Sequence, residues 1–337
     1  MNLKATIVVG ALVAYSLHGV ADQALNRAVT DGAKAKLVLH VVDQEGKAVE
    51  GATVKCWLWR NYSDGGPLGL DLITDRNGHC TAEGKCIGVV AWSVRKEGYY
   101  KSSGEWKLSQ TKANPKVSGG KWQPWGATRD VLLKKMIAPF TASVPPGLEQ
   151  LQRNIPVFGQ WLPMDLNLLD WLPPHGNGRC ADALIICNKR VKNFINDFEF
   201  TMTVSFTNNP CAGVYRIKKD IESDHQWAYR ADSNAVYSTT YQYALARAGA
   251  AERRQELGDG ECFVFRTRTK TDDDGNFVSA HYGVIAGEFS MGSKSLFLGD
   301  ICFNQTPNDT NIEDGYYLRR RIEGRKRSSS ATVRPKK

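Results

Sequence analysis

Short runs of β-branched and apolar residues, each ended by a turn sequence, recur along most of this 337-residue chain. The run Leu37–Val42 ends at the turn residues 43–46, and residues 52–59 alternate small or apolar with polar side chains. Residues 74–78 contain Asn77-Gly78, a pair that supplies the positive φ angles of a tight hairpin. Short strands joined by such turns are typical of packed sheets. The pattern predicts a mainly β protein, with an Ig-like or transthyretin-like β-sandwich followed by a larger β-rich domain of sandwich or jelly-roll type.

The same pattern continues along the rest of the chain. It predicts further strands at residues 87–94 and 130–134, and in the C-terminal half at 198–207, 261–269, 277–285 and 295–303. One helix is expected at Thr239–Leu257, because alanines at 244, 246, 248, 250 and 251 favour helical backbone. A hydrophobic share of 42% is that of a chain with a folded core.

The N-terminus has the order of a secretory signal peptide. A single cation, Lys4, precedes an apolar stretch from Ala5 to Leu17, and small residues lead to Ala21. The stretch is too short to cross roughly 30 Å of hydrocarbon, which disfavours a membrane anchor. We therefore expect residues 1–21 to be cleaved and the protein to reach the periplasm, the cell surface or the extracellular space.

The net charge of +9 belongs to one end of the chain. Nine of the 44 lysines and arginines and one of the 35 acids lie in residues 319–337. With these and Lys4 set aside, residues 22–318 contain 34 cations and 34 anions. A neutral body argues against a specific nucleic-acid partner, and the basic tail is predicted to be disordered. Such a tail would either attract anionic polymers or lipid head groups, or serve only for solubility.

Cysteine usage fits an oxidising compartment. The even number of cysteines favours disulfides, although spacing leaves their connectivity open; the eight candidates are Cys56, Cys80, Cys86, Cys180, Cys187, Cys211, Cys262 and Cys302. We expect Cys262 to pair with Cys302, since both lie in predicted strands. No CxxC pair is present, which disfavours structural zinc or a redox motif.

Three segments, in this order, resemble the carboxypeptidase regulatory-like module, a transthyretin-like or Ig-like β-sandwich: Val41–Val54, Thr74–Gly78 and Val94–Tyr100. The resemblance places this domain at residues 36–138. It implies a non-catalytic accessory fold and no particular substrate.

Residues 139–163 are rich in proline and are predicted to be a linker, followed by a β-rich domain at 164–318. Parts of the second half resemble uncharacterised secreted proteins of verrucomicrobial and lentisphaeral bacteria, namely Asp165-Leu166, Asp170-Trp171, the stretch from Phe265 to Gly283 and Thr306–Glu313. This resemblance implies export and leaves the biochemical activity open.

The strongest candidates for chemistry are Asp165, Asp170, His175 and Asp182, in one irregular stretch. Two carboxylates could serve a hydrolase as acid and base, or bind a hard metal ion together with the imidazole. The favoured interpretation is structural, because buried loops need acceptors for their backbone N–H groups. Residues 272–276 are likewise better explained as a hairpin turn than as a calcium loop. We expect no metal and no cofactor.

Six tryptophans could stack on sugars or fill the core of a small sandwich: Trp57, Trp59, Trp92, Trp106, Trp122 and Trp125. No Gly-x-Ser-x-Gly elbow and no HExxH motif occurs in the chain. The sequence thus predicts a non-enzymatic secreted or envelope protein that acts through protein or glycan contacts at the cell surface. The alternative is a secreted, glycan-directed hydrolase that uses acids of the 165–182 loop.

Overall fold

The computed structural model describes residues 23–61, 63, 65–140, 152–195, 197–248, 250–255, 260–286, 289–297 and 301–315. The chain forms two compact units. The first comprises Met1–Met136 together with Glu222–His225, and the second comprises Ile137–Ile221 and Gln226–Lys337. The expected signal peptide and basic tail lie outside the described residues. Within the described ranges, no helix has the length and hydropathy needed to cross a membrane.

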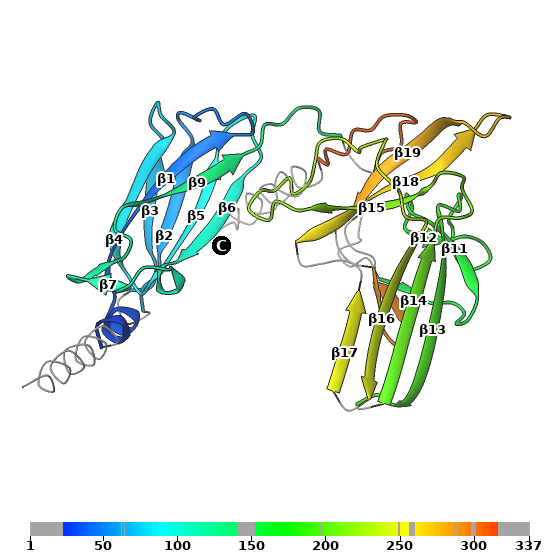
Figure 1. The fold of residues 1–337 in the computed structure, drawn as a ribbon, viewed down its shortest axis with the longest axis horizontal. Coiled ribbons are helices and arrows are strands. Elements are labelled where there is room, and N and C mark those ends of the chain that lie inside the picture. The colour runs from blue at the N-terminus through cyan, green and yellow to red at the C-terminus, as the bar shows by residue number, and fades with distance from the viewer. Residues whose placement is uncertain are drawn as a thin grey trace, which may run out of the picture. The chain divides into compact units, whose positions relative to one another are not determined.

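The first unit is a two-layered β-sandwich (Figure 1). Its first sheet has the order β4-β1-β8-β7, with β9 also paired to β1; these strands are β1 (Ala33–Asp43), β4 (His79–Cys86), β7 (Val117–Ser118), β8 (Lys121–Trp122) and β9 (Ala127–Leu133). The second sheet has the order β3-β2-β5-β6 and is antiparallel; its strands are β2 (Thr53–Leu58), β3 (Leu68–Ile73), β5 (Val89–Arg95) and β6 (Ser102–Lys107).

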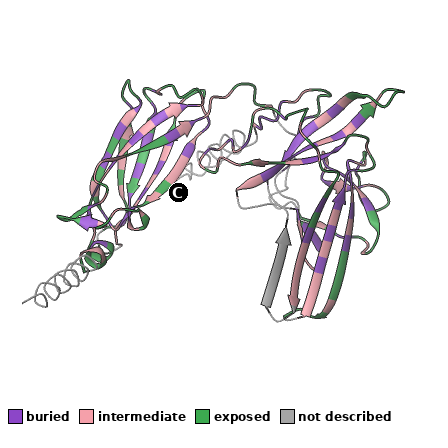
Figure 2. Ribbon diagram, in the orientation of Figure 1, coloured by how far each residue is buried: buried purple, intermediate pink, exposed green. Residues whose placement is uncertain are grey.

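Alternation along the strands builds the core of this sandwich. Every second residue of β1 is buried, and the same period recurs in β2 and β5, as Figure 2 shows. The inward side chains of both sheets form one cluster that includes Leu39, Cys56 and Trp92. A helix at residues 23–31 adds Ala28 to this cluster. The mainly β prediction is therefore confirmed.

The turn at residues 75–78 shows why its sequence is specific. Asp75 Oδ1 accepts hydrogen bonds from the backbone N–H groups of Asn77 and His79, both at 2.9 Å. Gly78 has φ +76°, and a Cβ at this position would collide with the carbonyl oxygen of Val41. Only glycine meets both requirements without strain.

The second unit contains three sheets. A six-stranded antiparallel sheet has the order β12-β11-β13-β14-β16-β17; its strands are β11 (Trp161–Asp165), β12 (Asp170–Trp171), β13 (Ala183–Asn193), β14 (Asp197–Ser205), β16 (Thr240–Ala248) and β17 (Ala250–Gln255). A four-stranded sheet, β15-β18-β19-β22, consists of β15 (Gly213–Lys218), β18 (Glu261–Thr271), β19 (Phe277–Ile285) and β22 (Ile301–Phe303). The third, β10-β21-β20, consists of β10 (Gln152–Asn154), β20 (Ser290–Met291) and β21 (Ser295–Phe297).

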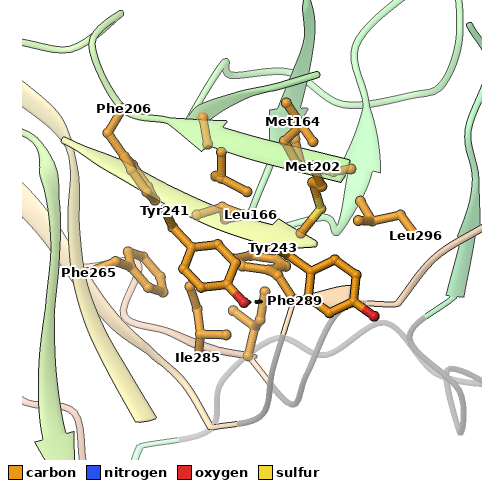
Figure 3. Close-up of a cluster of buried hydrophobic side chains, with 14 of the residues drawn as sticks. Met164, Leu166, Met202, Phe206, Tyr241, Tyr243, Phe265, Ile285, Phe289 and Leu296 are labelled. Carbon is orange, nitrogen blue, oxygen red and sulfur yellow. Dashed lines mark hydrogen bonds between the residues drawn. The ribbon is translucent and has the colours of Figure 1, made fainter. Parts of the chain in front are cut away.

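Side chains from all three sheets meet in one core (Figure 3). Phe263 and Phe265 of β18 point into this core, whereas Cys262 and Val264 belong to a second cluster with Trp227. The four-stranded sheet is thus covered on both faces, which is why residues 262–265 of β18 are buried consecutively rather than alternately.

The helix expected at Thr239–Leu257 is wrong, because Thr240–Ala248 and Ala250–Gln255 within it pair as the β16–β17 hairpin. Tyr241 and Tyr243 are buried in the core at alternate positions, and the Tyr241 hydroxyl donates to the Phe289 carbonyl at 3.0 Å (Figure 3). Burial of two aromatic rings at strand spacing outweighs the helix preference of alanine, which is less than about 1 kcal/mol per residue.

The linker expected at 139–163 is also wrong in its second part. Residues 152–154 form β10, which pairs with β21, and residues 161–163 open β11, which pairs with β13. Pro163 lies within β11. Proline content alone misled the prediction, since a proline is tolerated where its missing N–H is not needed for pairing.

Candidate functional site

The predicted site begins at the β11–β12 hairpin. Asp165 ends β11 and stands opposite Asp170, the first residue of β12. Asp182 immediately precedes β13, the neighbour of β11 on its other side. The sheet therefore brings Asp165 and Asp182 together, as the loop hypothesis required.

Asp165 is fully buried and accepts hydrogen bonds on both oxygens. Oδ1 and Oδ2 receive five donors, which are the backbone N–H groups of Asn167, Leu168, Arg179 and Cys180 at 2.9–3.2 Å and Arg268 Nη2 at 3.1 Å. An ionised carboxylate offers about four lone-pair positions. Asp165 is thus saturated by the loop that surrounds it.

Asp182 is held mainly by a side chain far away in the sequence. Arg268 binds it through two hydrogen bonds, Nε to Oδ1 at 2.8 Å and Nη2 to Oδ2 at 2.9 Å. Leu166 N–H donates to Oδ2 at 2.8 Å, and the Thr267 hydroxyl lies 3.4 Å from Oδ1. This two-point geometry is the strong form of an arginine–carboxylate pair.

A β-bulge directs Arg268 into the cluster. The pairing of β18 with β19 shifts register between Thr267 and Lys270, and Arg268 has a left-handed φ of +50°. A bulge re-aims a side chain that regular pleating would place elsewhere. The guanidinium also lies over the Phe303 ring, 4.7 Å from its centroid.

Burial sets the electrostatics of this cluster. Desolvation raises the pKa of Asp182, and the hydrogen bonds and charge of Arg268 only partly offset that rise. Burial alone would lower the pKa of Arg268, but its contacts with Asp182 leave that pKa above the ordinary value. Desolvation and the nearby Arg268 both lower the pKa of His281.

Asp170 and His175 do not join the other two acids on Arg268. Asp170 accepts the N–H groups of Trp171 and Asn177, both at 3.0 Å. His175 is exposed, and its backbone N–H donates to the Leu172 carbonyl at 3.1 Å. The four predicted residues therefore divide into a buried pair, a loop acceptor and a surface imidazole.

Two glycines fit this loop against the acids. A Cβ on Gly178 would lie 2.8 Å from the Asp170 carbonyl oxygen and 3.0 Å from the Asp165 Cβ. A Cβ on Gly176 would collide with the Trp171 carbonyl oxygen. The sequence Gly176-Asn177-Gly178 is thus explained by close approach of backbone to backbone.

The arrangement is suited to holding structure together. With all four oxygens of Asp165 and Asp182 occupied by donors, a metal ion or a substrate proton would first have to displace them. Among the described residues, no group of three or more histidines, cysteines or acids could hold a metal ion. The turn at 272–276 also binds itself, because Asp272 accepts the N–H groups of Asp274 and Asn276.

The six tryptophans of the first unit fall into two groups. Trp92 and Trp122 are core residues, Trp106 packs against that core, and Lys121 lies over the Trp125 ring. Trp57 and Trp59, by contrast, are 37% and 42% exposed. Trp57 lies on the outward face of β2, and Trp59 directly follows the end of this strand. Both side chains point away from the core, in the direction opposite to the buried Cys56 and Leu58.

The expected pairing of Cys262 with Cys302 is wrong for this fold. Their strands, β18 and β22, flank β19 on opposite sides, so their backbones are about 9.5 Å apart or more. A disulfide requires Cα atoms within about 7 Å. All eight cysteines are free thiols in this structure, and disulfides between other pairs stay a prediction.

Sequence reasoning missed two features. Arg268 had no local signal, because a bulge in a distant strand brings it to the acids. The pairing of Trp57 with Trp59 had a signal, since residues two apart in a strand share a face.

The sequence matches no protein-family model and no curated protein. Part of the fold is similar to 3-chlorocatechol 1,2-dioxygenase from Rhodococcus opacus 1CP, with 13% identity, 32% of this chain and 62% of that chain covered, and a TM-score of 0.25. Chlorocatechol 1,2-dioxygenase from Pseudomonas putida gives 13% identity, 31% and 61% coverage and the same TM-score, 0.25. The chain spans less than two thirds of each of these proteins, and likeness at this level carries no argument about activity.

Proposed function

We propose that this is an exported, non-catalytic protein that binds a partner at the cell surface through the outward face of the β3-β2-β5-β6 sheet. The observation that carries the proposal is the exposure of Trp57 and Trp59 side by side on that face. Indole side chains left in water on a well-packed sandwich are typical of binding surfaces.

The buried acids support the non-catalytic part of the proposal. A general acid or nucleophile needs an oxygen that reaches the substrate. Asp165 and Asp182 use theirs on backbone N–H groups and on Arg268. The glycan-directed hydrolase remains the alternative and would require this cluster to open.

The signal-peptide pattern supports export, and the basic tail offers a second contact to anionic polymers or lipid head groups. The resemblance to an accessory sandwich points the same way. Partner contacts made by the sheet face should be insensitive to salt, whereas those made by the tail should weaken as salt increases.

The test uses the chain beginning at Asp22 and insoluble bacterial envelope material, in portions treated with protease, with periodate or with neither. We expect retention in high salt that falls sharply in the Trp57→Ala/Trp59→Ala variant. Trp161→Ala is the matched control, because Trp161 is 48% exposed on the second unit. Equal retention of the double variant and the wild type would refute the proposal.

A further inference from the structure

Trp57 and Trp59 form an aromatic pair on the outward face of β2, and the residues around them indicate which class of ligand the pair can bind. Trp57 lies between Gly69 of β3 and Ala91 of β5, which are its paired neighbours. A Cβ on Gly69 would meet nothing within 4 Å. With small neighbours on both sides, no tall side chain stands beside the Trp57 ring in its row of the sheet.

The two indoles follow the strand. Residues two apart in a strand are separated by about 6.6–6.8 Å, so one extended ligand can contact both indoles. More than half of each tryptophan is covered, at 37% and 42% exposure, although its cross-strand neighbours are small or aliphatic. The exposed part of each indole is available to a ligand on this face.

The next row of the same face is polar. Lys55 precedes Trp57 by two residues and is paired in register with Asp71 of β3 and Ser93 of β5. Lys55 Nζ lies 3.5 Å from Asp71 Oδ1, and both side chains are exposed. This row presents donors and acceptors beside the rings, as the hydroxyl groups of a sugar require.

Charge on this face is nearly balanced. Lys55 pairs with Asp71, and Lys107 pairs with Glu105 at 2.9 Å. Arg95 is a further exposed cation at the far end of β5. Paired charges give little field to attract an anionic polymer. The two rings and the exposed Ile73 of the same face are also a small apolar area beside the roughly 800 Å² that each partner contributes to a stable protein interface.

We propose that the outward face of the β3-β2-β5-β6 sheet binds a neutral, extended polysaccharide whose successive pyranose rings stack on Trp57 and Trp59 along β2. The apolar faces of the rings contact the indoles, and their hydroxyl edges reach the polar row at Lys55. This inference rests on the proposed function and names its ligand class. It requires a chain of at least two rings, since one sugar covers one indole.

The experiment is affinity electrophoresis of the chain beginning at Asp22 through gels that contain hydroxyethyl cellulose, xyloglucan, glucomannan or polygalacturonate. We expect retardation by at least one of the three neutral polymers, unchanged by added salt. Trp57→Ala and Trp59→Ala should each weaken the apparent affinity about tenfold. Trp161→Ala should migrate as the wild type, and unchanged melting temperatures verify that all variants fold.

Each outcome is decisive. Retardation by polygalacturonate alone, or retardation by a neutral polymer that both tryptophan variants keep, would overturn the inference. If no neutral polymer retards the protein while protease-sensitive envelope retention still needs the tryptophans, the partner is a protein, and the proposed function stands without this inference. If the double variant keeps all envelope retention as well, both proposals fail.

Discussion

Arg268→Met should destabilise the second unit strongly. It removes the cation shared by two buried carboxylates, Asp165 and Asp182, while retaining much of the side-chain volume over Phe303. Asp165 keeps four backbone donors, so the loss falls mainly on Asp182, which keeps Leu166 N–H and the longer contact from Thr267. Breaking a buried ion pair by removing one partner costs about 3–5 kcal/mol.

Urea unfolding measures this loss, and hydrogen exchange in peptides from β13 and β14 assigns it to the second unit. Lys270→Met is the matched control, because Lys270 is an exposed cation two residues farther along β18, and its removal should change stability by less than about 0.5 kcal/mol. The double variant Asp182→Leu/Arg268→Met should recover part of the loss, since it leaves no unpaired charge at 182.

Acid should reduce the effect of Arg268→Met. A group whose folded-state pKa lies above its unfolded value stabilises the fold when protonated, and this stabilisation is lost as pH rises through the folded pKa. Burial already raises the pKa of Asp182, and loss of the cation raises it further. As the pH falls from 7 to roughly 4, the free energy of unfolding of the variant should therefore rise relative to that of the wild type. If Arg268→Met lowers the free energy of unfolding by less than about 1 kcal/mol at pH 7, or if the difference from the wild type does not become smaller in acid, the reasoning is refuted.

Three other changes have definite expectations. Gly178→Ala should lower the free energy of unfolding by about 1–3 kcal/mol, because the added Cβ would collide with the Asp170 carbonyl oxygen. Gly69→Ala, where the added Cβ enters open space, should have little effect. Equal urea midpoints for the two variants would contradict this expectation. In the reduced native protein, iodoacetamide should modify the exposed Cys180 and Cys211 first, since burial raises the pKa of the other six thiols; mass spectrometry showing early modification of a buried cysteine would argue against the packing. Truncation after Leu318 should weaken retention on a cation exchanger at low salt and leave the melting temperature within about a degree; a fall of several degrees would mean that residues 319–337 pack on the body.

Much of the fold could be predicted because strand alternation and turn chemistry are local properties. The period of two in β1 and the Asn77-Gly78 turn are both visible in the sequence, and they specify a half-buried strand and a tight turn. The sequence suggested that this turn closes a hairpin, but it joins β3 and β4, which belong to different sheets. The segment Thr240–Gln255 was misread because its alanines favour a helix locally. Only packing of Tyr241 against the distant Phe289 decides between the two.

The candidate site, too, could be predicted from the sequence only in part. The sequence by itself placed Asp165 and Asp182 near one another, since both flank one irregular loop. The tertiary structure decided what they do, because Arg268 reaches them from a bulge in β18, and register shifts of this kind leave no local pattern. Sequence alternation likewise put Trp57 and Trp59 on one face, but only the packing of two sheets around Cys56 and Trp92 determined that this face is the one in contact with water.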